Sequence, residues 1–254
     1  MAGPYGSDER SQIMTNLLEL TNISKRFGGL LAVDNVSFNL RRGGITALVG
    51  PNGAGKTTCF NLIAGALQPT VGAIRFEGEL ISGRPAEAIC RLGIGRTFQI
   101  VRPMRDMTVL ENAMVGAFSW TRKVAEARDA AFESLETVGL AVKAKSSISQ
   151  LTLPDRKMLE MAKALSTRPS LLLLDEVMAG LRPTEAASVV RVLHRLVERG
   201  LTILLVEHVM RIVMEAAENV VVLHHGAKIA EGVPQYIVKH PEVLAGYLGD
   251  GFSG

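Results

Sequence analysis

The hydrophobic residues of this 254-residue chain fall into short alternations and short continuous runs rather than long stretches. Val36, Phe38 and Leu40 alternate with polar residues, and the same pattern recurs around 74–76, where Ile74 and Phe76 flank an arginine. Alternation with a period of two is typical of strands that bury one face. We therefore expect a half-buried antiparallel sheet in the N-terminal third of the chain.

Continuous apolar runs of strand length recur along the chain and predict strands that are buried on both faces. They occupy residues 45–49, 171–174, 201–206 and 220–223. Helical patterns follow two of them, at residues 58–66 and at 184–199, where Gly200 provides the stop. Because strands that alternate with helices form parallel sheets, the sequence predicts an α/β fold with a parallel core sheet.

The middle of the chain carries apolar residues at helical spacing and predicts an amphipathic helix that ends at Gly139. The expected apolar stripe consists of Val124, Ala127, Ala131, Leu135 and Val138.

Composition excludes several classes of protein. A chain with 47% hydrophobic residues can bury a core as one large domain or as one domain with a subdomain. No apolar run reaches the roughly 18 residues of a membrane span. A net charge of +3 and 5% aromatic residues argue against nucleic acid as a partner. Cys59 and Cys90 are too few for a disulfide framework, which suits a reducing compartment.

Residues 1–14 are polar and lack the apolar segment of a secretion signal. We expect them to form a flexible N-terminal extension or an expression tag and leave them out of the fold prediction.

The most informative chemistry follows the run at 45–49, where residues 50–58 complete the pattern G-x-x-x-x-G-K-[ST]. The glycines let backbone N–H groups converge on phosphates, Lys56 supplies a charge for the β- and γ-phosphates, and the Thr57 hydroxyl can bind Mg²⁺. A glycine turn with an incidental lysine is the alternative, which the order of strand, loop and helix argues against. The residues expected to bind ATP here are Gly50, Pro51, Asn52, Gly53, Ala54, Gly55, Lys56, Thr57 and Thr58.

Asp175 and Glu176 end the run at 171–174 and form the second candidate element. Ligands of open α/β sheets bind beyond the carboxyl ends of the strands, so these carboxylates should face the phosphate loop. Asp175 is placed to hold Mg²⁺ through water, and Glu176 to polarise the attacking water. A polar turn after a strand is the alternative for this pair.

Two further polar residues extend the candidate site. His208 follows the strand at 201–206 and could reach a γ-phosphate oxygen, although a lone histidine after a strand is usually an ordinary surface residue. Gln99 could touch both Mg²⁺ and the attacking water, but by itself it would carry no information. We place Glu176, His208 and Gln99 as catalytic, and Thr57, Gln99 and Asp175 at the metal.

The order of these features resembles the ATP-binding-cassette ATPases, from about residue 17 to residue 248. The resemblance implies a P-loop NTPase core of the RecA-like type with an N-terminal antiparallel β subdomain and a helical subdomain. It places one cassette domain at residues 15–254, with the helical subdomain at about 95–165 and a C-terminal tail at about 230–254. It also implies that two cassettes sandwich two ATP molecules and that Phe27 packs against adenine.

Three segments are similar to the ATPase subunits of branched-chain, or hydrophobic, amino acid importers. They are GIGRTFQIVRPMRDMTVLENAMVG at 93–116, AGLRPTE at 179–185 and EGVPQYIVKHPEVLAGYLG near the C-terminus.

The family signature, a Leu-Ser-Gly-Gly-Gln type sequence, is altered at residues 151–155. Thr152 keeps the hydroxyl, but Pro154 lacks an N–H where the family has glycine, and Asp155 adds a carboxylate that should repel a phosphate. The helix should still form, because proline and aspartate suit a first turn. The signature contacts ATP bound by the partner cassette, so the weakened half would be the partner's site. Val177 and Val209 are further departures, which we expect to be tolerated.

Three function classes follow: an ATPase that powers a membrane importer, a soluble cassette ATPase outside transport, and a P-loop kinase or a regulatory nucleotide binder with weak turnover. Gln99, His208 and the helical insert argue against the kinase. A single short cassette fits a subunit that docks on separate permeases at the cytoplasmic face of the inner membrane. We expect its partner cassette to be a different chain, and a solute-binding protein to be an indirect partner. Residues 102–116 would dock, with Met104, Met107 and Met114 either as contacts or as ordinary core.

Overall fold

The structure is a computed structural model that describes residues 16–97 and 103–245. The predicted N-terminal extension, the end of the C-terminal tail and Gln99 lie outside these residues. In chain order the strands are β1 (Asn16–Phe27), β2 (Leu30–Arg41), β3 (Ile45–Val49), β4 (Val71–Phe76), β5 (Glu79–Leu80), β6 (Ile94–Arg96), β7 (Leu171–Asp175), β8 (Thr202–Val206), β9 (Asn219–His224) and β10 (Ala227–Gly232). The helices are α2 (Lys56–Ile63), α3 (Ala86–Arg91), α4 (Val109–Ala117), α5 (Val124–Thr137), α6 (Leu153–Leu165), α7 (Pro183–Glu198), α8 (Met210–Ala216), α9 (Pro234–Ile237) and α10 (Pro241–Val243), with 3₁₀ turns at Ala141–Lys143 and Ile148–Gln150.

The N-terminal alternation folds into an antiparallel sheet with strand order β2-β1-β4-β5, as predicted. In β2, Val36, Phe38 and Leu40 are buried while Asn39 between them is exposed. The one-sided burial gives this sheet an apolar face that packs into the same hydrophobic cluster as α2.

The continuous apolar runs form a second sheet with strand order β10-β9-β3-β8-β7-β6. The described pairs from β9 to β6 are parallel, and β10 pairs with β9 antiparallel. Strands β3, β7 and β8 are buried at every position, which confirms the prediction of a parallel core sheet. The parallel pairing brings the carboxyl ends of β3, β7 and β8 to one edge of the sheet.

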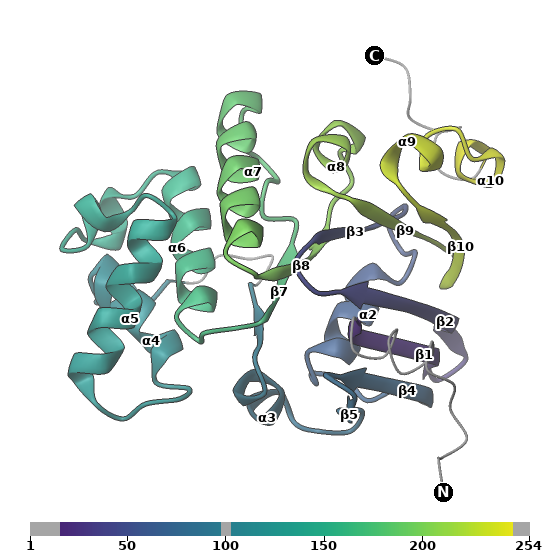
Figure 1. Cartoon of the computed structure of the whole chain (residues 1–254), viewed down its shortest axis with the longest axis horizontal. Helices are drawn as coiled ribbons and strands as arrows, with labels where there is room; N and C mark the ends of the chain where they lie inside the picture. The colour runs from purple at the N-terminus through teal and green to yellow at the C-terminus, as the bar shows by residue number, and fades with distance from the viewer. Residues whose placement is uncertain (1–15, 98–102, 246–254) are drawn as a thin grey trace, which may run out of the picture.

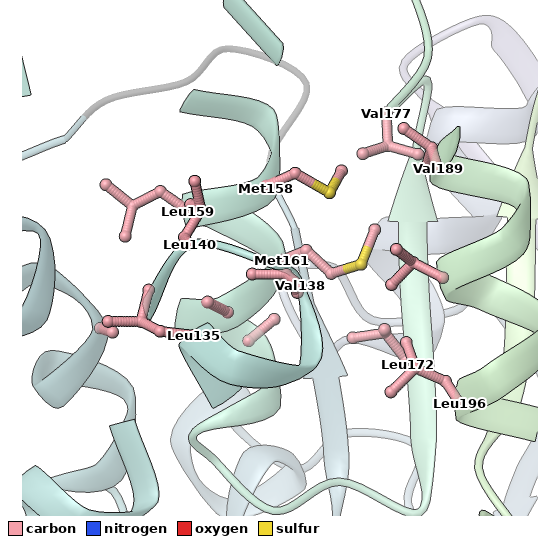
Figure 2. Packing of buried hydrophobic residues seen from close by; sticks show 14 of the residues in the cluster. Leu135, Val138, Leu140, Met158, Leu159, Met161, Leu172, Val177, Val189 and Leu196 are labelled. Atoms are coloured by element: carbon pink, nitrogen blue, oxygen red, sulfur yellow. The ribbon is translucent and has the colours of Figure 1, made fainter. Parts of the chain in front are cut away.

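Helices α4, α5 and α6 lie together at one end of the molecule, away from the antiparallel sheet (Figure 1). Helix α6 lies between the two parts: Leu159 faces Leu140 and the α5 side, while Met158 and Met161 face β7 and α7 (Figure 2). Helix α4 crosses α6 so closely that a Cβ at Gly116 would collide with the carbonyl oxygen of Lys163. The helical region is thus packed against the parallel sheet through α6.

One residue of the predicted helical stripe is placed differently. Ala127, Ala131 and Leu135 are buried as expected, but Val124 is 56% exposed. Val124 is the first residue of α5, where the helix has not yet reached the core. Within residues 16–97 and 103–245, no helix has both the length and the hydropathy of a membrane span.

Candidate functional site

The phosphate-binding loop joins β3 to α2 and depends on glycine at two positions. Gly50 and Gly55 have φ angles of 150° and 98°, which residues with a Cβ rarely adopt. A Cβ at Gly50 would collide with the carbonyl oxygen of Leu223, and one at Gly55 would lie 2.5 Å from that of Ala32. The loop is therefore held close to backbone on both sides.

The turn of the β9–β10 hairpin is hydrogen-bonded to the phosphate loop. The N–H of Gly226 donates to the carbonyl oxygen of Ala54 at 3.2 Å, and the carbonyl oxygen of Gly226 accepts from the N–H of Asp34 at 2.8 Å. One hairpin glycine thus ties the phosphate loop to the antiparallel sheet.

Helix α2 begins directly at Lys56, with Gly55 as its N-cap in a left-handed conformation and without a side-chain cap. The first N–H groups of a helix have no partner within the helix, and they point toward the loop. This arrangement leaves donors available to an anion at the positive end of the helix.

Lys56 lies inside the loop and is only 7% exposed. Its Nζ donates to the carbonyl oxygens of Gly50 at 2.7 Å and of Pro51 at 2.9 Å. Burial lowers the pKa of Lys56, while the nearby carboxylates of Glu176 and Asp175 act in the opposite direction. The loop lysine and the acidic pair after β7 are thus close enough to interact.

Asp175 ends β7 and is 3% exposed. Burial raises the pKa of its carboxyl, and the positive charges of Arg96 and Lys56 oppose that rise. The Nη2 atom of Arg96 lies 3.7 Å from Asp175 Oδ2, and its Nη1 donates to Asn61 Oδ1 of α2 at 2.7 Å. Arg96 therefore links the acidic residue to the helix that follows the phosphate loop.

Glu176 has a positive φ of 48°, unusual for a residue with a side chain. Its N–H donates to the carbonyl oxygen of Val206 at 3.1 Å, which ties the turn to β8. Its Oε1 lies 3.8 Å from Nδ1 of His208. The structure therefore brings Glu176 and His208 together from neighbouring strand ends.

The group at the strand ends has the donor chemistry that Mg²⁺ and a triphosphate require. Mg²⁺ prefers oxygen ligands and is usually held by one or two protein groups together with substrate phosphates and water. Thr57 and Asp175 offer a hydroxyl and a carboxylate, while the loop N–H groups and Lys56 suit the phosphates. The residues present fit magnesium bound with ATP.

Phe27 is the last residue of β1, and its side chain is 44% exposed. The Nζ atom of Lys25 lies 5.2 Å from the centre of the Phe27 ring, within cation–π range. The ring is accessible, as the predicted contact with adenine needs, and that contact stays a prediction. Gln99 lies outside the described residues, so its two roles also stay predictions.

The altered signature forms the start of α6. Thr152 is the N-cap, and its hydroxyl oxygen accepts from the N–H of Asp155 at 3.4 Å. Asp155 Oδ2 in turn accepts from the N–H of Thr152 at 3.0 Å and from its hydroxyl at 2.8 Å. Pro154 lies in the first turn between them. The expectation that this helix forms despite the substitutions is confirmed.

Asp155 also has a cationic partner that the sequence did not indicate. Lys143 Nζ lies 2.6 Å from Asp155 Oδ2. Burial acts to raise the pKa of Asp155, but the hydrogen bonds from Lys143 and Thr152 outweigh it and leave the pKa below its usual value. The added carboxylate is therefore held within its own helix end and partly neutralised, so it repels a nearby phosphate less than an isolated charge would.

Sequence reasoning assigned no role to several charged residues beside the site, above all Arg96 and Lys157. Lys157 is 7% exposed, and its Nζ donates to the carbonyl oxygen of Glu176 at 3.2 Å. The spacing of the sequence could have indicated that Lys157 is buried, because it lies four residues before Met161 and so shares the buried face of the helix. Glu207 is 1% exposed, and burial raises its pKa.

Comparison with protein families matches residues 33–179 to the family described as ABC transporter. The chain is 40% identical over 250 residues to the high-affinity branched-chain amino acid transport ATP-binding protein BraF of Pseudomonas aeruginosa, covering 92% of this chain and 98% of BraF. It is 41% identical to the protein LivG of Salmonella typhimurium with the same coverage, and 32% identical to the probable LivG of Methanocaldococcus jannaschii.

The similar solved structures are also ATP-binding cassettes of ABC transporters. A nucleotide-free ATP-binding cassette from an ABC transporter superposes with a TM-score of 0.85 and 30% identity, covering 92% of this chain and all of that one. The ADP conformation of the cassette MJ1267 has the same TM-score and identity over 92% of this chain and 99% of the other.

Proposed function

This chain belongs to the ABC transporter family as an ATP-binding-cassette ATPase, and on that basis we propose that it powers an importer of branched-chain or related hydrophobic amino acids or amides. The observation that carries the ATPase role is that Asp175, Glu176 and His208 lie at the carboxyl ends of β7 and β8, with β3 and its phosphate loop next to β8. The similarity to BraF and LivG over nearly the whole chain supports this choice of solute. These relatives do not favour a soluble cassette outside transport, or a regulatory subunit.

The phosphate loop, residues 50–58, binds the triphosphate of ATP in this proposal. Its N–H groups and the Lys56 ammonium neutralise phosphate charge, while Thr57 and Asp175 would hold Mg²⁺, the latter through water. A metal held there would supply positive charge beside the phosphates. Phe27, at the end of β1, stacks on the adenine through its exposed ring.

Glu176 orients and polarises the attacking water, and His208 contacts the γ-phosphate. Their 3.8 Å separation lets the two side chains act on one reacting group. Gln99 completes the group by touching the metal and the water, as the resemblance implies. The division of the chain into a cassette with a helical subdomain at about 95–165 belongs to the same proposal.

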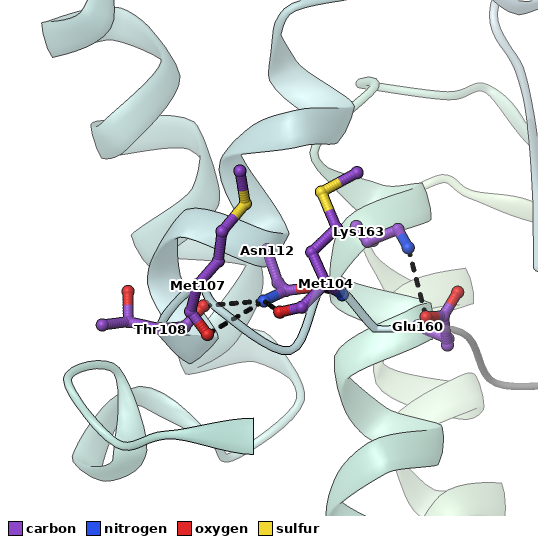
Figure 3. Close-up of polar contacts among 6 residues, drawn as sticks. All are labelled: Met104, Met107, Thr108, Asn112, Glu160 and Lys163. Carbon is purple, nitrogen blue, oxygen red and sulfur yellow. Dashed lines mark hydrogen bonds and ion pairs between the residues drawn. The ribbon is translucent and has the colours of Figure 1, made fainter. Parts of the chain in front are cut away.

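Permease subunits dock on residues 102–116, above all on the loop before α4, which keeps the chain peripheral, at the cytoplasmic face of the inner membrane. Met104 and Met107 are 43% and 39% exposed, whereas Met114 is buried in the core. Buried Asn112 holds this loop: its amide donates to the carbonyl oxygens of Met104, Met107 and Thr108 and accepts from the N–H of Met104 (Figure 3). Two adaptable apolar side chains are thus presented on a fixed backbone.

The working unit pairs this chain with a second, different cassette, and a solute-binding protein delivers the solute. The start of α6 supports a hetero-pair, because Pro154 lacks an N–H and Thr152 and Asp155 bind each other. A homodimer would place this weakened helix end at both ATP sites. The purified chain alone should therefore hydrolyse ATP slowly, and fast, cooperative hydrolysis by it would refute the hetero-pair.

Transport tests the proposal directly. Cells that lack the gene for this chain should lose uptake of radiolabelled leucine, isoleucine and valine, and the parent gene should restore it. A Glu176→Gln gene should fail to restore uptake although its product assembles. Normal uptake of these amino acids without the chain, combined with loss of uptake of another solute class, would overturn the solute assignment but not the ATPase.

A further inference from the structure

Lys157 is a buried cation on α6 that none of the roles above uses. Its side chain extends from the helical region to the turn after β7, where Nζ donates to the carbonyl oxygen of Glu176 at 3.2 Å. Burial lowers the pKa of Lys157, while the negative charges of Glu176, Glu207 and Asp175 act to raise it. These carboxylates come from the ends of β7 and β8, so the ammonium is bonded to the turn after β7 and lies within electrostatic range of both strand ends.

The backbone that Lys157 contacts is strained. Glu176 has a φ of 48°, in the left-handed region that residues with a Cβ rarely adopt. Such a conformation persists only where its surroundings hold it. Here the N–H of Glu176 is bound by Val206 and its carbonyl oxygen by Lys157, so both polar backbone groups of the residue are fixed.

Helix α6 contacts the same turn at other points. A Cβ on Gly180 would lie 3.4 Å from Leu153 Cδ2, at the first residue of the helix. Met158, next to Lys157, lies in one buried cluster with Val177, which follows Glu176, and Figure 2 shows the two side chains facing each other. Packing and one charged hydrogen bond thus connect α6 to the backbone of Glu176.

We propose that Lys157 is a positioning residue for Glu176, which couples the orientation of the signature helix to the placement of the carboxylate that acts on the attacking water. The proposal rests on the proposed role of Glu176. Lys157 itself touches no reacting atom. Because α6 begins at the segment that faces the partner's nucleotide, closure of the pair would reach Glu176 through this contact.

The test measures kcat and KM for ATP in the complete transporter complex. Lys157→Met keeps the aliphatic stem and removes the ammonium, Lys157→Arg keeps a donor, and Lys163→Met is the matched control on the same helix, since Lys163 pairs with Glu160 instead. Lys157→Met should lower kcat about tenfold to a hundredfold with KM within about twofold of the parent, the size expected for a misplaced catalytic group. Lys157→Arg should recover most of the rate, and Lys163→Met should keep it.

A double substitution separates positioning from general damage to the fold. In a Glu176→Gln background, Lys157→Met should change the residual rate by less than about twofold, because the carboxylate through which it acts is already absent. An equal loss in both backgrounds, or a raised KM with unchanged kcat, would overturn the inference. An unchanged rate in Glu176→Gln alone would instead contradict the proposed role of Glu176.

Discussion

Two helix starts in this molecule are built in opposite ways. Helix α2 begins after Gly55, with no side-chain cap and no acidic residue in its first turn. Helix α6 begins after Thr152, with a reciprocal pair between Thr152 and Asp155 and a proline in the first turn. In the proposed function both starts face ATP phosphates, α2 those of its own site and α6 those of the partner's site.

The difference shows that a helix end can be optimised for its own stability or for an anion, but the two compete. A side-chain cap satisfies N–H groups that a phosphate would otherwise use. Helix α2 leaves these groups open and relies on the surrounding backbone to hold the loop. At the start of α6 the N–H groups of Thr152 and Asp155 are satisfied within the helix, and Lys143 holds Asp155. We call the phosphate loop with α2, Asp175 and Glu176 the complete half of the site, and the start of α6, which faces the partner's ATP in the proposed function, the weakened half. Substitutions can distinguish the two.

The largest effect should come from the complete half. Glu176→Gln should retain ATP binding but slow hydrolysis in the assembled complex by about 10²–10⁴-fold, the usual contribution of a positioned general base. The amide keeps the size of the side chain and loses its ability to accept the proton of water. Single-turnover kinetics with a parallel measurement of ATP affinity would check this, and parental turnover would show that the role of Glu176 is assigned wrongly.

Lys56→Ala should weaken ATP binding itself. Hydrogen bonds to charged groups contribute about 1.5–3 kcal/mol, so the dissociation constant for ATP should rise about 10- to 150-fold. Titration of the purified chain with a fluorescent ATP analogue measures it, with Lys123→Ala as a control, since Lys123 lies at the start of α5 and pairs with Glu126. Equal affinity in Lys56→Ala and the parent would contradict the loop assignment.

The weakened half should be improvable. Pro154→Gly combined with Asp155→Gln should add one N–H donor at the partner's site, worth about 1.5–3 kcal/mol, and remove a carboxylate that Lys143 already partly neutralises. Losing the proline frees the unfolded chain, which should lower the free energy of unfolding by about 1 kcal/mol but does not reduce the gain at the site. Nucleotide trapping, with the loop lysine of each cassette replaced in turn, should show a gain of about tenfold or more at the partner's site and little change at this chain's own site. No gain at the partner's site would mean that residues 151–155 do not face its phosphate.

The smallest expected effect concerns stability. The pKa of Asp155 is lowered from 3.8, so its ionised form stabilises the folded state above that pH, and this contribution is lost as the pH falls through the lowered value. Asp155→Asn should reduce the free energy of unfolding by about 0.5–1.5 kcal/mol at neutral pH, as a weakened cap and a lost partly exposed ion pair together predict. Urea unfolding at pH 7 and near pH 3 should show the difference between variant and parent shrinking in acid. If the difference in the free energy of unfolding between variant and parent were the same near pH 3, it would come from packing and not from the charge of Asp155.

The phosphate loop, the strands and the helices were predictable because each depends on neighbours in sequence. Residues 50–58 carry the turn glycines, the lysine and the hydroxyl within nine positions. The runs at 45–49 and 171–174 needed no partner to be recognised as buried strands. The capped start of α6 was also predictable, since Thr152 and Asp155 are three residues apart.

The charged contacts around the site were decided by tertiary structure alone. Arg96 meets Asp175, Lys143 meets Asp155, and Lys157 meets Glu176 across separations that no local pattern encodes. Val124 was expected in the core and is exposed, because periodicity defines a face of a helix but not where that face stops touching its neighbours. The sequence by itself therefore determined the core sheet and the phosphate loop through local propensity and spacing, and indicated the family through the resemblance of its motifs. Only the tertiary structure decided which of these charges meet, because their energies depend on distance in space rather than along the chain.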